Sequence, residues 1–376
     1  MKKQKGYEIE SLEELHRLIQ SESEFINVAF QNLDLSAVEG EFKSRLVKNC
    51  IFLGCTISDS LHSYLSKGPN LIFPQIDVPY NPYKATLYSI DELYDGFNPS
   101  NPDSYKLTPD FRIYEYYNEK GKYYPDTIFE TLAQKLHDHS ITDAFMDVLE
   151  NLEQKKIIAI MGGHGLRRDW ESYYKVAQIS KQLVEEDYFM LSGGGPGAME
   201  ATHLGAWMAK RPNDDLVVAV NMLSEAPHYS DKFWLSRAFQ VIERFPKLYD
   251  KISDIGIPTW LYGHEPATPF AALIAKYFEN SVREEGLLAY AFGGVIYSPG
   301  SAGTIQEIFQ DAAQNHYKSY EFASPMIFLD THYWNDIKPI YPLLNKLAEG
   351  KDYKKWLKIS DEVDEIVNHI KAFTNS

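Results

Sequence analysis

The fold can be worked out from one stretch of the sequence, Ser298-Pro299-Gly300-Ser301-Ala302-Gly303-Thr304-Ile305-Gln306-Glu307. Residues 294–297 before it are apolar and predict a strand, and the apolar spacing after it, from Ile305 to Ala313, predicts a helix. A strand that turns directly into a helix leaves the first N–H groups of that helix unpaired, at the positive end of its dipole. Such a helix start binds anions, most naturally phosphate. We therefore predict that this turn holds a phosphate and that Glu307, on the first helical turn, acts on the molecule attached to it.

The sequence from Lys155 onward alternates predicted strands with predicted helices. Strands are expected at residues 157–161, 188–191, 216–220, 258–262, 294–297 and 326–329, and late helices at 268–283, 337–347 and 362–373. This alternation predicts an α/β fold with a Rossmann-like, doubly wound parallel sheet. Such sheets bind ligands at the carboxyl ends of their strands, where we expect the glycine-rich loops at residues 162, 193 and 300. Residues 151–376 are accordingly assigned to a nucleotide-binding, catalytic domain.

Residues 1–150 are predicted to form a mixed accessory region that is rich in proline and tyrosine. A capping box, Ser11 with Glu14, predicts a short helix at 11–21. The segments 30–36 and 52–58 resemble each other, but two copies are too few for a solenoid, so the similarity is interpreted as chance. The prolines of 69–125 predict extended chain, followed by a helix at 128–152. That helix carries His137 and His139. Because residues two apart point to different helix faces, a metal site is less expected than contact with the ligand site, and a solvated helix face is expected most.

Composition limits the classes of function. The net charge of −16 and the lack of a basic stripe argue against nucleic acid as a partner, whereas backbone amides can bind one phosphate without net charge. Only Cys50 and Cys55 are present, which predicts reduced thiols rather than a disulfide framework. Because no signal peptide or membrane-length apolar run is found, we expect a cytoplasmic protein without a membrane partner. No metal or cofactor is predicted.

The second glycine loop formally matches a dinucleotide fingerprint. Gly193, Gly195 and Ala198 fit G-x-G-x-x-[GA], which is typical of nicotinamide or flavin enzymes when the next strand ends in an acidic residue. The expected strand at 216–220 ends instead in Asn221, which disfavours that interpretation. A purely structural role in helix–strand packing is the other alternative, and several such loops on one sheet edge make it less attractive. We predict a mononucleotide-sized pocket.

Two motifs carry a resemblance to a known family. The segment from Ser192 to Met199 resembles the GGGxxGLM element of the LOG (LONELY GUY) family, whose members are often labelled lysine decarboxylase-like, and the segment from Pro299 to Glu307 is similar to its PGGxGTxxE element. The resemblance covers about residues 155–370. It implies a phosphoribohydrolase that cleaves a nucleoside 5′-monophosphate, AMP-like, to free base and ribose 5-phosphate. It also implies a homodimer or higher homo-oligomer. A true pyridoxal-dependent decarboxylase is disfavoured, because no lysine follows a strand in a suitable setting.

Site residues follow from this resemblance position by position. Glu307 matches the catalytic glutamate, and Arg283 is the candidate for a family arginine although its flanks differ, with a surface arginine at a helix end as the alternative. Ser301 replaces a family glycine, which alters the turn or adds a donor. The predicted nucleotide-binding residues are Gly162, Gly163, His164, Gly193, Gly194, Gly195, Gly197, Met199, Gly300, Ser301, Gly303 and Thr304. The alternative function is a nucleotide sensor that binds without cleaving, which the carboxylate of Glu307 beside a phosphate disfavours.

Overall fold

The computed structural model describes residues 7–122 and 124–376, and the chain folds into two compact units. The first combines the chain up to Leu87 with Lys120–Asp147, and the second combines Tyr88–Glu119 with Val148–Ser376. This division differs from the expected boundary at residue 150, because Tyr88–Glu119 belongs to the second unit. Two contacts tie that segment in: the Tyr94 hydroxyl donates to the Ala267 carbonyl, and Asp110 forms a buried ion pair with Lys276.

The first unit is a short parallel solenoid. Its main sheet has the order β1 (Tyr7–Ile9), β3 (Val28–Gln31), β5 (Ile51–Leu53) and β6 (Leu71–Phe73), and a second parallel pair joins β2 (Glu24–Ile26) to β4 (Leu46–Lys48). Ile9, Phe30, Phe52 and Ile72 lie side by side on adjacent strands. The interpretation of the 30–36 and 52–58 similarity as chance was therefore wrong. Two further coils, whose sequences differ, complete a stack that two copies alone could not stabilise.

Aromatic packing fills the solenoid. The rings of Phe25, Phe30, Phe42 and Phe52 contact one another and are fully buried. The same core includes residues of α1 (Leu12–Ser21), which starts with the predicted capping box, α2 (Glu39–Lys43) and α3 (Asp59–Leu65). The 22-residue α6 (Ile128–Leu149) belongs to the same unit as far as Asp147. Cys50 and Cys55 are free and buried. Burial raises the pKa of the Cys55 thiol to about 11, so this thiol is unreactive at neutral pH.

The second unit contains an all-parallel sheet in the order β10-β9-β8-β7-β11-β12-β13. Its strands are β7 (Ile157–Met161), β8 (Phe189–Ser192), β9 (Asp254–Gly256), β10 (Leu273–Ile274), β11 (Gly294–Tyr297), β12 (Met326–Leu329) and β13 (Leu357–Ser360). From β9 to β13 this is the doubly wound order, and the direction of winding reverses between β7 and β11. The predicted Rossmann-like α/β fold is confirmed for this unit.

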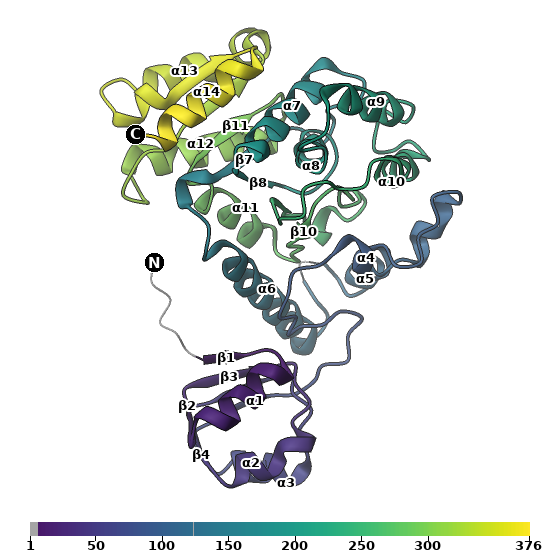
Figure 1. Cartoon of the computed structure of the whole chain (residues 1–376), viewed down its shortest axis with the longest axis vertical. Helices are drawn as coiled ribbons and strands as arrows, with labels where there is room; N and C mark the ends of the chain where they lie inside the picture. The colour runs from purple at the N-terminus through teal and green to yellow at the C-terminus, as the bar shows by residue number, and fades with distance from the viewer. Residues whose placement is uncertain (1–6, 123) are drawn as a thin grey trace. The chain divides into compact units, whose positions relative to one another are not determined.

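Helices cover both faces of that sheet (Figure 1). On one face, Ile158, Ile160 and Ile296 pack in one core with α7 (Glu171–Glu185), α8 (Ala198–Trp207) and α14 (Val363–Thr374). Alternate strand residues serve the other face, where Tyr297 contacts α12 (Ala302–Tyr317) and stacks on Phe328. The remaining helical elements are α4 (Ile90–Leu93), α5 (Pro109–Glu119), α9 (Asn213–Leu223), α10 (Trp234–Arg244), α11 (Asn280–Ala289), α13 (Ile340–Leu347) and short turns at 36–38, 102–107, 154–156, 260–262, 333–337 and 352–356.

Several element predictions were wrong. Residues 216–220 lie in α9 rather than in a strand, because Leu216, Ala219 and Leu223 are buried at helical spacing. The third strand is β9 instead. Residues 258–262 form a single bridge at Thr259 and a 3₁₀ turn, and the expected helix at 268–283 is replaced by β10 and a helix that begins at Asn280.

The proline-rich region also differs from the expectation of extended chain, since it contains α4 and α5. Pro109 stands in the first turn of α5, the position in a helix that tolerates proline, so it begins this helix rather than preventing it.

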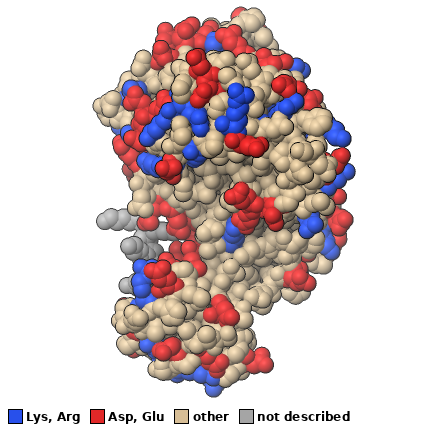
Figure 2. Space-filling model, turned by 45° about the vertical axis from the view of Figure 1, so that its right-hand side comes forward, with Lys and Arg blue, Asp and Glu red and all other residues tan. Residues whose placement is uncertain are grey.

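Surface charge is mixed. Figure 2 shows acidic and basic side chains interspersed over one face of the described residues. Among residues 7–122 and 124–376, no helix combines the length and apolarity that crossing a bilayer requires.

Candidate functional site

A cavity of about 570 Å³ opens where β7, β8 and β11 end, beside the point at which the winding of the sheet reverses. Residues predicted from the sequence to bind the nucleotide that line it are Gly162, Gly163, His164, Gly193, Gly195, Met199, Gly300, Ser301, Gly303 and Thr304. Both residues predicted to be catalytic, Glu307 and Arg283, line it as well. The glycine-rich loops therefore meet at one cavity, as expected for strand ends of a parallel sheet.

Gly194 and Gly197, also predicted to bind the nucleotide, do not line the cavity but shape the loop behind it. Both have a left-handed backbone, with φ of +67° and +71°. A Cβ on Gly197 would lie 2.3 Å from the carbonyl oxygen of Gly163. These glycines are required by the turn rather than by contact with a ligand.

The loops after β7 and β11 are held against each other. The Gly163 N–H donates to the Pro299 carbonyl at 3.0 Å, and a Cβ on Gly162 would lie 2.0 Å from Ser298 Oγ. Only glycine at 162 permits this approach. The predicted phosphate turn and the first glycine loop consequently form one continuous wall of the cavity.

The predicted phosphate turn leads directly into α12. Its N-cap residue is Ser301, and among the described residues no side-chain hydrogen bond caps this helix start. Ser301 has φ of −111°, outside the left-handed region, so serine replaces the family glycine there without backbone strain. The helix start faces the cavity with its N–H groups and the positive end of its dipole.

Lys338 brings a positive charge to this turn that sequence reasoning missed. Its Nζ donates to the Gly300 carbonyl at 3.1 Å and lies 3.4 Å from Ser301 Oγ, and the Tyr333 hydroxyl donates to the same carbonyl. Both residues follow β12, outside either glycine motif, so motif spacing carried no signal for them. A phosphate bound at the turn would lie beside an ammonium group.

Glu307 and Arg283 form an ion pair at the cavity wall. Arg283 Nη1 lies 3.7 Å from Glu307 Oε1, and Arg283 Nε donates to the Ile257 carbonyl at 2.8 Å. Burial raises the pKa of Glu307 to about 7, the charge of Arg283 lowers it and that of Glu284 raises it. A Cβ on Gly193 would lie 2.1 Å from Arg283 Nη2, so this glycine makes room for the guanidinium. The alternative of a surface arginine does not fit these contacts.

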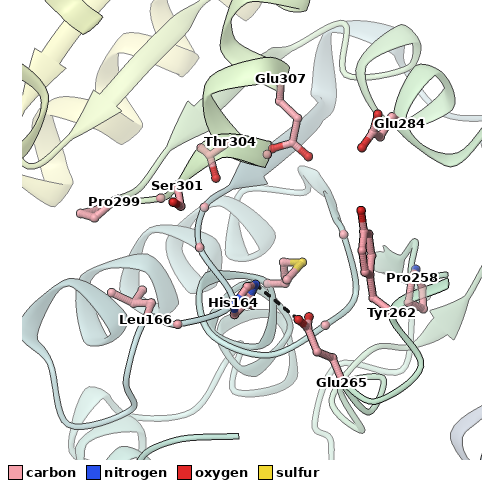
Figure 3. A pocket seen from close by; sticks show the side chains of 18 of the residues that line it. His164, Leu166, Pro258, Tyr262, Glu265, Glu284, Pro299, Ser301, Thr304 and Glu307 are labelled. Carbon is pink, nitrogen blue, oxygen red and sulfur yellow. Dashed lines mark ion pairs between the residues drawn. The ribbon is translucent and has the colours of Figure 1, made fainter. Parts of the chain in front are cut away.

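A second carboxylate, Glu265, faces the cavity from the side opposite Glu307 (Figure 3). Its Oε1 lies 3.4 Å from His164 Nδ1 and 3.7 Å from His264 Nε2, and burial raises its pKa. Glu265 follows the 3₁₀ turn at 260–262. The sequence predicted a strand there, so Glu265 was not recognised as a site residue. His164 itself is half exposed, and its ring lies nearly perpendicular to that of Tyr229, with the centroids 5.6 Å apart.

Glu284 also lines the cavity, and each of its carboxylate oxygens accepts a hydrogen bond from a neighbouring side chain. Its Oε1 accepts from Asn280 Nδ2 at 2.6 Å, and its Oε2 accepts from Gln306 Nε2 at 2.8 Å. The second bond joins α11 to α12, whereas the first lies within α11. The carboxylates of Glu307 and Glu265, in contrast, have charged or histidine neighbours at 3.4–3.7 Å and accept no hydrogen bond from the described residues.

Behind the second glycine loop lies a buried Ser–His–Asp chain. His203 Nε2 lies 2.7 Å from Ser192 Oγ, and its Nδ1 lies 2.7 Å from Asp254 Oδ1. All three residues are fully buried, which excludes them as a nucleophilic triad for an outside substrate. Ser192 Oγ accepts from the Gly194 N–H at 3.1 Å, so the chain fixes the glycine loop.

Three acidic side chains lie together in the first unit, where Glu8, Asp143 and Asp147 have carboxylate oxygens within 4.8 Å of one another. Together with burial, these acids raise the pKa of Glu10 to about 7. His137, considered above as a ligand, is buried with its Nδ1 3.2 Å from Asp138 and its ring against Tyr80.

The dinucleotide alternative finds no support at the relevant strand. The next strand along the chain after β8 is β9, which also pairs with β8 in the sheet. Ile257 and Pro258 follow β9, where a dinucleotide site would have an acid. The ribose-binding acid of a dinucleotide site is thus absent from that position of the described chain.

No family model matches the chain. Solved structures that are similar to it include a molybdenum cofactor binding protein from Rippkaea orientalis, with 16% identity, a TM-score of 0.38, and coverage of 58% of this chain and 96% of that one. Two structures of the Moco carrier protein from Chlamydomonas reinhardtii are similar as well, with 14% and 13% identity and TM-scores of 0.35 and 0.36. Each match covers 58% of this chain, and the matches cover 98% and 99% of the two carrier chains. Likeness at this level carries no inference about ligand or activity.

Proposed function

We propose that the second unit hydrolyses the N-glycosidic bond of a nucleoside 5′-monophosphate, releasing the free base and ribose 5-phosphate. The observation that supports this most directly is the position of Glu307. Glu307 is the sixth residue of α12, so it stands on the second helical turn rather than on the first turn as expected, and it lines the same cavity as the phosphate turn. The proposal also follows the resemblance of this site's two motifs to the LOG family.

Phosphate binding would position the substrate. The start of α12 and Lys338 would hold the phosphate, so that the ribose extends past the carboxylate of Glu307. Binding energy from the phosphate, which does not react, is spent on orienting the anomeric carbon.

Glu307 would act on the anomeric carbon. Cleavage passes through a transition state in which positive charge develops at C1′ and the ring oxygen, and a carboxylate stabilises that charge or takes a proton from the attacking water. The C1′–N bond breaks, its electron pair and a proton go to the base, and the water oxygen bonds to C1′. Arg283, 3.7 Å away, keeps part of the Glu307 population ionised near neutral pH.

The direct test is incubation with AMP, GMP, CMP and UMP, followed by detection of free base and ribose 5-phosphate. We expect turnover of at least one nucleotide and a loss of about 10²-fold or more in kcat for Glu307→Gln. Glu285→Gln is the control, because Glu285 is exposed on α11 and does not line the cavity. Full activity of Glu307→Gln would contradict the assigned role. Tight nucleotide binding without any product would favour the sensor alternative.

A further inference from the structure

The cavity has a second end, away from the phosphate turn, that the proposed reaction leaves without a role. Glu265 occupies it, fixed by its backbone N–H, which donates to the Tyr262 carbonyl at 2.8 Å. Its Oε2 lies 3.8 Å from the position that a Cβ on Gly195 would take, so the carboxylate stands against the second glycine loop. The Glu265 side chain is only 13% exposed.

The carboxylate of Glu265 keeps capacity to accept hydrogen bonds. His164 Nδ1 at 3.4 Å and His264 Nε2 at 3.7 Å lie beyond the usual length of an N–H···O bond to its Oε1. Burial raises the pKa of Glu265, and the charges of His164, His264 and Arg283 oppose that shift. In Figure 3 the Glu265 carboxylate points into the cavity toward His164, on the side opposite Glu307.

We infer, resting on the proposed function, that Glu265 reads the base of the nucleotide and selects guanine. An ionised carboxylate only accepts hydrogen bonds, through two oxygens that suit a pair of adjacent donors. With the phosphate at α12 and the ribose at Glu307, the base is the part of the substrate left for this end of the cavity.

Guanine fits because its Watson–Crick edge presents two neighbouring donors, N1–H and the 2-amino group. Adenine and cytosine each place an acceptor beside their amino donor, and uracil flanks one N–H with two carbonyls. Each of these would direct a lone pair at a nearly buried carboxylate, which is unfavourable and leaves polar groups unpaired.

An aromatic side chain at this end adds affinity without selecting the base. Tyr262, whose carbonyl accepts from the Glu265 N–H, lines the cavity and is 46% exposed. Stacking on such rings tolerates any base, because every base has a π-face. The discrimination therefore depends on Glu265.

The test compares kcat/KM for GMP, AMP, CMP and UMP in the wild type, Glu265→Gln and the exposed control Glu285→Gln. We expect the wild type to prefer GMP over AMP by about 10-fold or more. A glutamine amide offers one donor beside one acceptor, which complements adenine, so Glu265→Gln is expected to lose the GMP preference and gain on AMP. Glu285→Gln should keep the wild-type order.

Calorimetric titration of the same nucleotides separates this inference from the proposed reaction. If no product forms but GMP binds more tightly than AMP, and Glu265→Gln reverses that order, the hydrolase proposal fails and the base assignment stands. A wild type that binds and cleaves GMP no better than AMP overturns the inference, whatever the variant does. An equal loss on all four nucleotides in Glu265→Gln also overturns it, because that indicates contact with the ribose or proton donation to any leaving base.

Discussion

Arg283 Nη1 lies 3.7 Å from Glu307 Oε1, and both side chains are almost withdrawn from water, with 11% and 13% exposed. The arginine comes from α11 and the glutamate from α12, so the pairing depends on the contact between these two helices. Burial and the guanidinium act in opposite directions on the pKa of the carboxyl, and burial is the larger effect. This balance makes the protonation state of Glu307 sensitive to its surroundings near neutral pH.

The first prediction concerns pH. Glu307 has a pKa of about 7 in the folded protein, and stabilising positive charge at C1′ or deprotonating water requires its ionised form. We therefore expect kcat/KM to be low at pH 5, to rise through about pH 7 and to reach a plateau above it. Measuring hydrolysis from pH 5 to 9 tests this. A profile that is flat from pH 5 to 8, or that falls with increasing pH, would contradict the role.

The second prediction concerns Arg283. Removing its charge in Arg283→Met should raise the pKa of Glu307 further, because the arginine lowers it. The acidic limb of the pH profile should move upward by about one unit or more, whereas Arg283→Lys should move it less. Arg283 also donates to the Ile257 carbonyl, so thermal unfolding of each variant is the necessary control. An unchanged acidic limb in Arg283→Met would show that the pair does not control this ionisation.

The third prediction concerns Lys338, which contacts Gly300 and Ser301 at the phosphate turn. Lys338→Met should raise KM for the nucleotide by about 10- to 100-fold, the value of one charge-assisted hydrogen bond, with a smaller change in kcat. Lys338→Arg should restore part of the affinity. Lys351→Met, at an exposed position outside the cavity, is the matched control. If Lys338→Met and Lys351→Met give the same KM, the phosphate does not lie beside Lys338.

In the second unit, the sequence predicted the structure correctly where local residue preferences determine it. Gly-Gly after an apolar run and Pro-Gly before a helical pattern placed the glycine loops, because strand ends and helix starts have strong residue preferences. Leu216–Val220 was misassigned because the same apolar, β-branched run fits a strand or a buried helix face. Burial at every third or fourth residue becomes visible only in the fold.

Two site residues were not predicted from the sequence, and both were missed for the same reason. Glu265 and Lys338 lie in connections after β9 and β12, where no motif or periodicity marks them, and they reach the cavity only through tertiary packing. The solenoid of the first unit was hidden in a similar way. Its coils around Ile9 and Ile72 pair with those around Phe30 and Phe52 through backbone hydrogen bonds that do not require similar sequences.

The last prediction concerns stability. One turn beyond Glu307 on α12, Asp311 is buried, accepts from the Tyr297 hydroxyl at 2.7 Å and from Asn315 Nδ2 at 3.0 Å. Burial raises its pKa to about 7, against an ordinary value of 3.8. Between these values the folded protein keeps a proton that the unfolded chain releases, so the free energy of unfolding should fall as pH rises from about 4 to about 7.

Urea denaturation between pH 4.5 and 8.5 measures this effect. Asp311→Asn cannot ionise, so it should remove part of the decline with pH, which is on the order of 1.4 kcal/mol per unit for one fully linked proton. Glu307 contributes in the same direction, and Glu307→Gln should remove a similar part because its pKa is also about 7. The two reductions should add in the double variant only if the acids titrate independently. A decline that survives in the double variant would assign the linkage to other acids, such as Glu10, whose pKa is also about 7.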